Sequence, residues 1–453
     1  MALKDLTVGK KRSLILQFAW PMLLGNVFQQ LYNVVDSIIV GNYLGKEALA
    51  AVGASAPIIF AMVSLIIGFS MGFTIIISQF FGAKKMDMVR RTIDTLNIFL
   101  FFSSIVISAL GVYFSEDLLR LLNIPETIIE PATIYLRIYL SGLVFFFGYN
   151  STAAILRGVG DSKTPLYFLI ISTVLNIILV LLFVVVFHWG IAGASVATLI
   201  SQGVAYIISV FYLNIHYKEI CIKLKNLVFD WAILKKSIAI GLPTGLQITF
   251  VSIGMMALMS IVGGYGTDVI AAYSVAIRID SFASLPAMNF SAALSSFVGQ
   301  NIGAEKHERV KKGYVATLQM NAVITILMTA VILIFPGWLM KAFTPDLEVI
   351  NIGKEYLYIV GGFYIVYTSM FVNNGVMRGA GDTLIPMFIT LISLWLIRIP
   401  LAWYLSHHFS YQGIWWSVPL AWAVAMILSY SYYKTGRWKK KSVTKNISIE
   451  AIE

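Results

Sequence analysis

The chain has 453 residues, of which 58% are hydrophobic and only 12% are charged. An average soluble domain carries about 25% charged residues, so the composition excludes an ordinary soluble protein. The net charge of +11 does not indicate nucleic-acid binding, because the basic residues gather in loops on one side of a series of apolar runs. We therefore expect an integral membrane protein that binds no nucleic acid.

Apolar runs follow one another along the whole chain, and each is about 20 residues or longer, enough to cross a hydrocarbon core about 30 Å thick. The first run is too long and too polar for a cleaved signal peptide. This pattern predicts an all-α membrane protein with about twelve transmembrane helices. The predicted spans are 14–38, 50–77, 92–114, 132–155, 165–187, 191–213, 237–261, 270–299, 314–335, 353–376, 385–405 and 412–433.

Lys and Arg are distributed unevenly between the loops. Of the 33, 26 lie in the terminal segments or in loops that follow even-numbered spans, five lie toward the opposite side, and two lie within spans. Basic residues collect on the cytoplasmic side of a membrane, so both termini are predicted to be cytoplasmic. The basic tail from Lys434 either signals this topology or attracts anionic lipid.

Two motifs recur at a constant offset. Residues 157–161, Arg-Gly-Val-Gly-Asp, return as Arg-Gly-Ala-Gly-Asp at 378–382, 221 residues further on. Residues 79–83, Gln-Phe-Phe-Gly-Ala, return at the same offset as Gln-Asn-Ile-Gly-Ala at 300–304. Such matches indicate that a multi-helix unit was duplicated, which is a common architecture of secondary transporters.

A polar linker from His216 to Lys236 separates six predicted spans from six. A unit duplicated without reversal gives two parallel halves around an axis along the membrane normal. We predict two six-helix lobes, 1–222 and 223–453, related by a pseudo-two-fold axis, with cation coupling in the first lobe.

Motifs of an enzyme are missing. Residues 158–164 invite comparison with a phosphate-binding loop, but Ser162 stands where that loop needs its second glycine. The five histidines show no metal-ligand spacing with Cys or carboxylate partners. We predict no enzymatic activity, no cofactor and no nucleotide site, so that an ion gradient must supply the energy.

Asp36 lies within the first predicted span, where an ionised carboxylate costs about 2.5–3.5 kcal/mol on insertion scales. It must face the protein interior, bind a cation or take up a proton. Asn26, Gln29, Asn33 and Asp36 are spaced 3, 4 and 3 apart and form one polar stripe on the helix. The stripe indicates either a wet cavity or hydrogen bonds between helices.

The second half does not copy this stripe. At an offset of 222 the four positions become Ile248, Val251, Met255 and Leu258. Ion chemistry is therefore predicted in the first half. Met255 and Met259 give the matching surface an adaptable apolar lining, which suits a promiscuous pocket, although lipid-facing or core positions are the alternative.

Three further charges lie within spans. Arg278 and Asp280 are two residues apart, about 200° around a helix, so they do not face each other. Asp280 and Arg398 are predicted to pair between helices, forming either a structural bridge or a polar wall of a substrate chamber. Pro21 removes a helix hydrogen bond in the first span and is predicted to be a hinge.

Taken together, these features resemble the multidrug and toxic compound extrusion (MATE) family over nearly the whole chain. The residues that carry the resemblance are Trp20-Pro21, Asp36 in its Val-Val-Asp context, and the duplicated motifs at 79–83 and 157–161. The resemblance implies two lobes with a central cleft and export of amphipathic, often cationic compounds, driven by inward flow of protons or sodium. It further implies a functional monomer in contact with lipids of a bacterial or archaeal cytoplasmic membrane.

The resemblance also assigns site residues. Asp36 matches the family's first-span carboxylate, Asn176 a fifth-span Asn and Thr198 a sixth-span Thr; Asn33 is added to this coupling site. Many relatives carry a second carboxylate where this chain has Val180. That departure favours the proton-coupled, DinF-like branch, with sodium at Asp36 as the alternative.

The remaining polar and Met residues of the spans are assigned to the substrate cleft. The predicted cleft residues are Gln29, Asn26, Met255, Met259, Asp280, Arg278, Arg398 and Asn373. A lipid-linked precursor flippase is the alternative function, and it would favour a cleft richer in Arg and Lys. A membrane-embedded enzyme or a passive channel is a third class.

Overall fold

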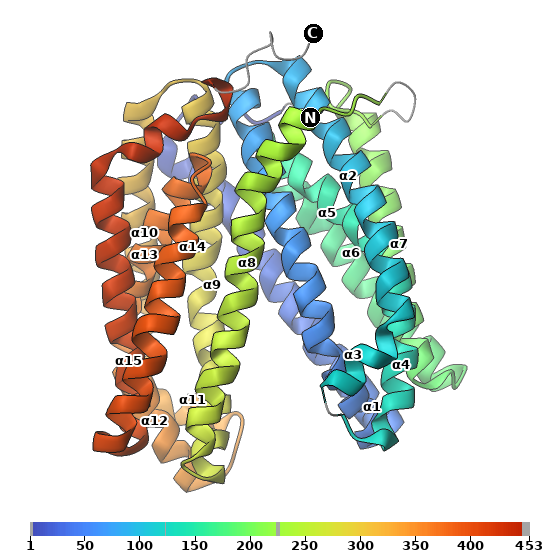
Figure 1. Cartoon of the computed structure of the whole chain (residues 1–453), viewed down its shortest axis with the longest axis vertical. Helices are drawn as coiled ribbons and strands as arrows, with labels where there is room; N and C mark the ends of the chain where they lie inside the picture. Colours follow the sequence, from blue (N-terminus) through green and yellow to red (C-terminus); the bar gives the residue numbers. More distant parts are fainter. Residues whose placement is uncertain (1–2, 123, 223–226, 446–453) are drawn as a thin grey trace. The chain divides into compact units, whose positions relative to one another are not determined.

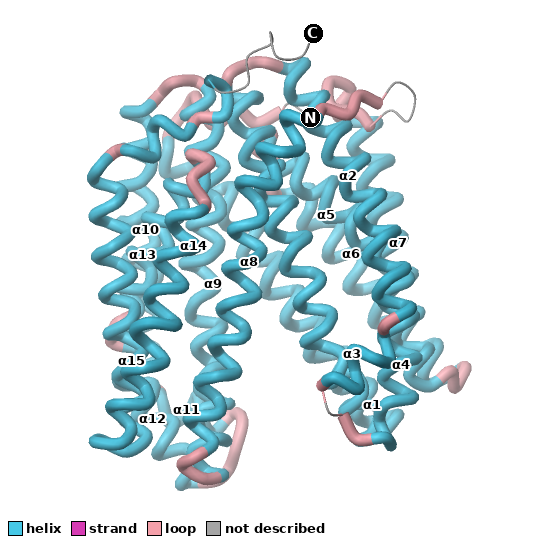
Figure 2. Tube along the Cα trace, viewed as in Figure 1, coloured by secondary structure: helices cyan, strands magenta, loops and turns pink. Residues whose placement is uncertain are grey.

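The structure is a computed structural model that describes residues 3–122, 124–222 and 227–445 (Figures 1 and 2). Within these ranges the chain forms helices and no strand, which confirms the all-α prediction (Figure 2). Residues 223–226, which belong to the predicted linker, lie outside the described residues.

The chain divides into two compact units. The first consists mainly of Trp20–Gly245, and the second of Leu246–Asn446 together with Leu6–Ala19. The division between the units therefore falls inside one helix, between Gly245 and Leu246. The lobe boundary at 222 and 223 stays a prediction.

The helices of the first unit follow the predicted spans in order. They are α1 (Lys11–Gly82), which begins in the second unit, α2 (Met86–Tyr113), α3 (Ser115–Leu121), α4 (Glu126–Ser141), α5 (Leu143–Gly158), α6 (Lys163–Val180), η1 (Leu181–Val186), α7 (Gly190–His216) and the first part of α8 (Trp231–Gly263).

The second unit takes the rest of α8 and the helices that follow. They are α9 (Thr267–Gly303), α10 (His307–Ile334), α11 (Pro336–Lys341), α12 (Leu347–Gly361), α13 (Tyr364–Gly379), α14 (Leu384–Leu391), η2 (Ile392–Arg398), α15 (Ile399–Thr435), η3 (Arg437–Lys441) and η4 (Val443–Lys445).

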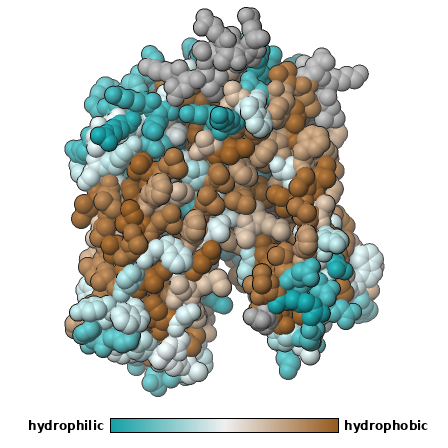
Figure 3. Space-filling model, viewed as in Figure 1, coloured by the Kyte–Doolittle hydropathy of each residue, from teal (hydrophilic) through white to brown (hydrophobic). Residues whose placement is uncertain are grey.

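Among the described residues, eight helical stretches are long and apolar enough to cross a membrane, and two bent pairs, α4 with α5 and α12 with α13, raise the number to ten. Two of the eight each hold two spans, because the backbone leaves the helical region at Gly45 in α1 and at Phe409 and Ser410 in α15. This confirms the twelve predicted spans. Hydrophobic side chains cover the middle of the helices and hydrophilic ones gather at their ends (Figure 3).

The two halves repeat one another in backbone detail. Gly45 and Gly266, 221 residues apart, have φ of 83° and 94°. In the repeated Arg-Gly-x-Gly-Asp motif, Gly160 and Gly381 both have φ of 90°, a conformation that glycine adopts without strain. The duplication inferred from the motifs is thus confirmed in the conformation of the turns.

The Asp of the repeated motif holds its loop in place. Asp161 accepts hydrogen bonds from the backbone N–H groups of Lys163 and Thr164, at 2.9 and 3.1 Å, and from the hydroxyl of Tyr217 at 2.7 Å. Burial and the hydrogen bond to Asp161 raise the pKa of Tyr217. In the second unit, Asp382 accepts from the Tyr432 hydroxyl at 2.5 Å. The motif therefore has a structural role in both units.

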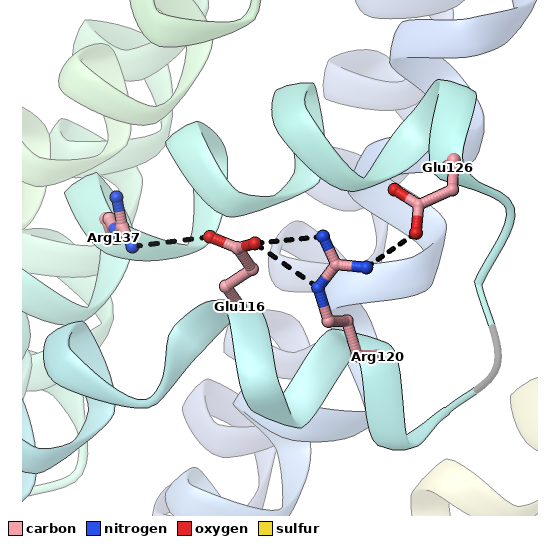
Figure 4. Close-up of polar contacts among 4 residues, drawn as sticks. All are labelled: Glu116, Arg120, Glu126 and Arg137. Atoms are coloured by element: carbon pink, nitrogen blue, oxygen red, sulfur yellow. Dashed lines mark hydrogen bonds and ion pairs between the residues drawn. The ribbon is translucent and has the colours of Figure 1, made fainter.

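Helices α3 and α4 are joined by exposed ion pairs (Figure 4). The guanidinium of Arg120 contacts Glu116 at 3.1 Å and Glu126 at 2.5 Å, and Arg137 lies 3.8 Å from Glu116. All four side chains are solvent-accessible, so these pairs contribute little to the stability of the fold.

Four glycines bring α1 and α8 into backbone contact within the first unit. Gly68 and Gly72 of α1 are four residues apart, as are Gly241 and Gly245 of α8. A Cβ at Gly68 would lie 2.5 Å from the backbone nitrogen of Gly245, and one at Gly72 would collide with the carbonyl oxygen of Ser237. Small residues at this spacing let membrane helices approach closely.

We predict that Gly72→Ala destabilises the protein by about 1–3 kcal/mol, because the added methyl group forces α1 away from α8. Gly53→Ala is the matched control, since a Cβ at Gly53, also in α1, meets nothing within 4 Å. Thermal unfolding in detergent measures both variants. Equal melting temperatures for the two would contradict the close contact.

Candidate functional site

Asp36 is a buried carboxylate in apolar surroundings. The residue is 9% exposed, and its Oδ1 atom has no hydrogen-bond partner among the described residues. Ile39 and Val40, on the next turn of α1, belong to an apolar cluster. Leaving an ionised oxygen unpaired in such surroundings costs free energy.

A short chain of hydrogen bonds lies next to Asp36. The Tyr32 hydroxyl, one helical turn before Asp36, lies 3.1 Å from Oγ1 of Thr198. The Asn176 amide donates to the same Oγ1 at 3.2 Å, and Thr198 itself donates to the Ala194 carbonyl at 3.2 Å. These bonds join α1, α6 and α7. The Oδ1 atom of Asn176 is buried and has no partner among the described residues.

Apolar side chains of α1, α6, η1 and α7 pack beside this polar group. The cluster contains Ile39 and Val40 of α1, Val180 of α6, Phe183 and Val184 of η1, and Ala194 and Ala197 of α7. Val180, where many relatives carry a second carboxylate, is fully buried in it. Asp36 therefore has no acidic neighbour at that position.

The bend between α4 and α5 borders the same region. The two helices meet at 46°, with Gly142 between them. A small pocket at this bend is lined by Tyr139, Gly142, Leu143, Phe146, Thr198, Leu199 and Gln202. Thr198 thus faces both the hydrogen-bonded chain and the pocket.

The four residues of the predicted polar stripe differ in their exposure. Asp36 is buried, whereas Gln29 and Asn33 are exposed and Asn26 is half-buried. Tyr32 was not predicted, although its position four residues before Asp36 puts both side chains on one helix face. Asn176 and Thr198 do lie together, as described above. The role of all these residues in coupling stays a prediction.

The predicted ion pair between Asp280 and Arg398 is wrong: no N···O contact of 4 Å or less joins these two described residues. Both lie in the second unit, Asp280 in α9 and Arg398 at the end of η2. Arg398 Nη1 instead contacts the Met255 sulfur at 3.7 Å. Arg278, two residues before Asp280, is exposed.

The remaining residues predicted for the cleft and the hinge pack or form hydrogen bonds within the protein. Met259 packs against the core of the second unit. Asn373 is 1% exposed; it accepts from the Tyr314 hydroxyl at 2.9 Å and donates to Ser429 at 3.0 Å, which joins three helices. Pro21 is buried within α1. No group of three or more His, Cys, Asp or Glu side chains suited to a metal occurs in the described part of the chain.

A duplicated six-span unit with an ionisable side chain buried between its helices defines a membrane transporter rather than an enzyme. The MatE family profile matches residues 21–182 and again residues 243–404, two segments 222 residues apart. The chain belongs to the MatE family, as its resemblance to multidrug and toxic compound extrusion transporters indicated.

Two relatives are similar to this chain over nearly the whole length of both sequences. The chain is 35% identical to the probable multidrug resistance protein YpnP of Bacillus subtilis, covering 96% of this chain and 97% of that protein. It is 28% identical to the probable multidrug resistance protein NorM of Thermotoga maritima, covering 96% and 95%.

A solved structure shares the fold. The chain aligns to the outward-facing conformation of a multidrug resistance MATE family transporter of the MOP superfamily with a TM-score of 0.91 and 23% identity. The alignment covers 97% of this chain and 99% of that one. It shows a twelve-helix fold for this chain, in agreement with the spans counted above.

We predict that Thr198→Val destabilises the protein by about 1–3 kcal/mol, because the Tyr32 hydroxyl and the Asn176 amide both lose their partner. Thr198→Ser keeps the oxygen and should restore most of the stability. The measurement is thermal unfolding in detergent. A valine variant as stable as the serine variant would show that this hydroxyl does not join the helices.

Proposed function

We propose that the chain is a secondary active multidrug efflux antiporter, which exports amphipathic, often cationic compounds in exchange for inward flow of protons. One observation carries the proposal: the carboxylate of Asp36, with an unpartnered oxygen, is buried between helices of a duplicated membrane unit. The names of its relatives YpnP and NorM, probable multidrug resistance proteins, support drug export as the activity.

In the proposed cycle, a proton neutralises Asp36 and removes the cost of a bare charge in apolar surroundings. Neutral Asp36 no longer favours a bound cation, so the substrate leaves outward. Loss of the proton on the inner side restores the charged state and the affinity for the next cation. Because the coupling is reciprocal, bound substrate lowers the proton affinity of Asp36 by the same factor.

The supply of oxygen atoms supports a proton over sodium as the coupling ion. Hard cations require several oxygen ligands. Around Asp36, the Asn176 Oδ1 atom is unpartnered, whereas Thr198 Oγ1 already takes part in three hydrogen-bonding contacts. Val180 contributes no oxygen. Sodium at Asp36, with Asn176 as a ligand, is the alternative.

We further propose a membrane location, an oligomeric state and a hinge. Basic loops favour both termini in the cytoplasm. The relatives named above come from bacteria, which supports the cytoplasmic membrane of a bacterium or archaeon as the location. One chain contains both halves of the duplicated unit, so a monomer suffices for the cycle. Pro21 in α1 is the proposed hinge, because it removes a hydrogen bond from the helix that carries Asp36.

We predict that Asp36→Asn abolishes dye export driven by a pH gradient while the protein folds as well as the native chain or better, because the variant loses a buried unpaired charge. The assay is efflux of a fluorescent organic cation from proteoliposomes, under a pH gradient and then under a sodium gradient. Glu47→Gln, an exposed carboxylate of the same helix, is the matched control.

Retained export in Asp36→Asn would remove Asp36 from the mechanism. Export that requires sodium would move the assignment of the ion from proton to sodium. If the native chain moves no dye under either gradient, drug export is wrong, and a lipid-linked precursor flippase becomes the function to test.

A further inference from the structure

The second copy of the repeated Gln-x-x-Gly-Ala motif binds the backbone of the N-terminal segment. Gln300 Oε1 accepts a hydrogen bond from the backbone N–H of Leu6 at 2.8 Å, and the Asn301 amide donates to the Leu6 carbonyl oxygen at 3.3 Å. All three residues are buried. Two side chains therefore satisfy both polar groups of one backbone residue, as a neighbouring strand would in a sheet.

Two basic side chains that follow the motif hold the same segment. Lys306 Nζ donates to the Thr7 carbonyl oxygen at 3.1 Å and lies 3.3 Å from the Thr7 hydroxyl. Arg309 Nη2 donates to the Leu6 carbonyl oxygen at 3.2 Å. Every partner belongs to the second unit, which includes Leu6–Ala19. Leu6 and Thr7 are called the docked pair below, and their socket consists of Gln300, Asn301, Lys306 and Arg309.

A short exposed turn joins the docked pair to α1. Val8, Gly9 and Lys10 are exposed, and the helix begins at Lys11. Gly9 has φ of 90°, a conformation that glycine adopts without strain. Hinges are a few loop or terminal residues that absorb a change of backbone angles. The docked pair can therefore swing out of its socket about Gly9 while α1 stays wound.

Helix α1 belongs to both units, and the docked pair lies just before its start. Residues 6–19 are part of the second unit, whereas α1 from Trp20 onward, with Asp36, is part of the first. Transporters built from duplicated units work largely by moving one unit against the other. Such a movement acts on α1 between Ala19 and Trp20. Either the helix deforms there, or one of its attachments gives way.

The attachment to the second unit is the easier one to release. It begins with hydrogen bonds between side chains and backbone beyond the end of a span, and water can replace each partner when the docked pair leaves. The next contact, between the side chains of Arg12 and Gln319, is exposed. In the first unit, α1 instead meets α8 in backbone contact at Gly68 and Gly72, which leaves no room for water.

The segment before α8 is bound to the first unit in a stiffer way. The Asp230 backbone N–H donates to Thr95 Oγ1 at 3.0 Å, and the Asp230 carboxylate accepts from the Ile233 backbone N–H at 3.0 Å. Helix α8 begins at the next residue, Trp231, so the bound residue is also the cap of the helix. The exposed glycine turn is thus a feature of the N-terminal segment and not of its counterpart.

We propose that the docked pair is a latch of the transport cycle. Seated in its socket, it holds the start of α1 on the second unit, and it must leave the socket before α1 can follow the first unit. The proposal rests on the export function proposed above. It gives the second Gln-x-x-Gly-Ala motif a role as the receptor of the latch.

The test locks the latch reversibly. In a chain that carries Cys221→Ser, the substitutions Val8→Cys and Glu305→Cys place exposed thiols next to Thr7 and Lys306. A short bis-maleimide with a cleavable disulfide joins them before reconstitution. Efflux of a fluorescent organic cation from proteoliposomes should fall by about tenfold or more in the linked chain, because a gating step is blocked, and should return on reduction.

Glu308→Cys with Lys312→Cys is the matched control. Both residues are exposed and lie four residues apart on α10, so the same reagent links them without crossing the docked contact. Export by this linked chain should equal that of the unlinked one.

Hydrogen exchange measures the same opening without transport. The Leu6 backbone N–H is buried and bonded to Gln300, so it exchanges when the docked pair leaves the socket. We expect it to exchange about tenfold faster, or more, than the backbone N–H groups around Gly72 in the interior of α1. The link between positions 8 and 305 should remove this difference.

Full export by the chain linked at 8 and 305 would overturn the inference, and so would exchange at Leu6 as slow as in the interior of α1. Either result would make the docked pair a fixed part of the fold. A reagent that fails to join the two thiols would show that the docked contact itself is absent. If the unlinked chain moves no dye, the export function fails, and the exchange measurement still decides whether the docked pair opens.

Discussion

The cost of a carboxylate in apolar surroundings is the constraint on which the first unit depends. Asp36 lies one turn from a cluster of Ile, Val, Phe and Ala side chains, and one of its oxygens has no partner among the described residues. Such a group is stable only with a proton, a cation or a ligand near it. Hydrogen bonds through Tyr32, Asn176 and Thr198 fix the three helices around it.

The spans and the duplication could be predicted because each leaves a one-dimensional signal. A run of apolar residues marks a span wherever it packs, and a constant offset marks a repeat. The bends at Gly142 and between α12 and α13 gave no such signal, since apolar residues continue through both breaks. The contact of Gly68 and Gly72 with α8 depends on which helices are neighbours, which spacing within one helix does not contain.

The site could be predicted only in part, because the sequence does not show which helices are neighbours. Asp36 stands out because a charge in a span is costly. Helical spacing placed Asn33 on its face, but the structure exposes Asn33 and buries Asp36, because the rotation of α1 is set by its neighbours. Asp280 and Arg398 lie in helical stretches that are long and apolar enough to span a membrane, yet they do not form the predicted ion pair. Whether two helices bring their charges into contact depends on tertiary packing.

We propose above that Asp36 exchanges a proton for the substrate. The most direct test is to count protons released when an organic cation binds the purified protein in weakly buffered detergent solution, with a pH indicator as the readout. We expect proton release on binding to the native chain and its loss in Asp36→Asn, because binding of substrate and proton to Asp36 is reciprocally coupled. Equal release from the native chain and the variant would contradict it.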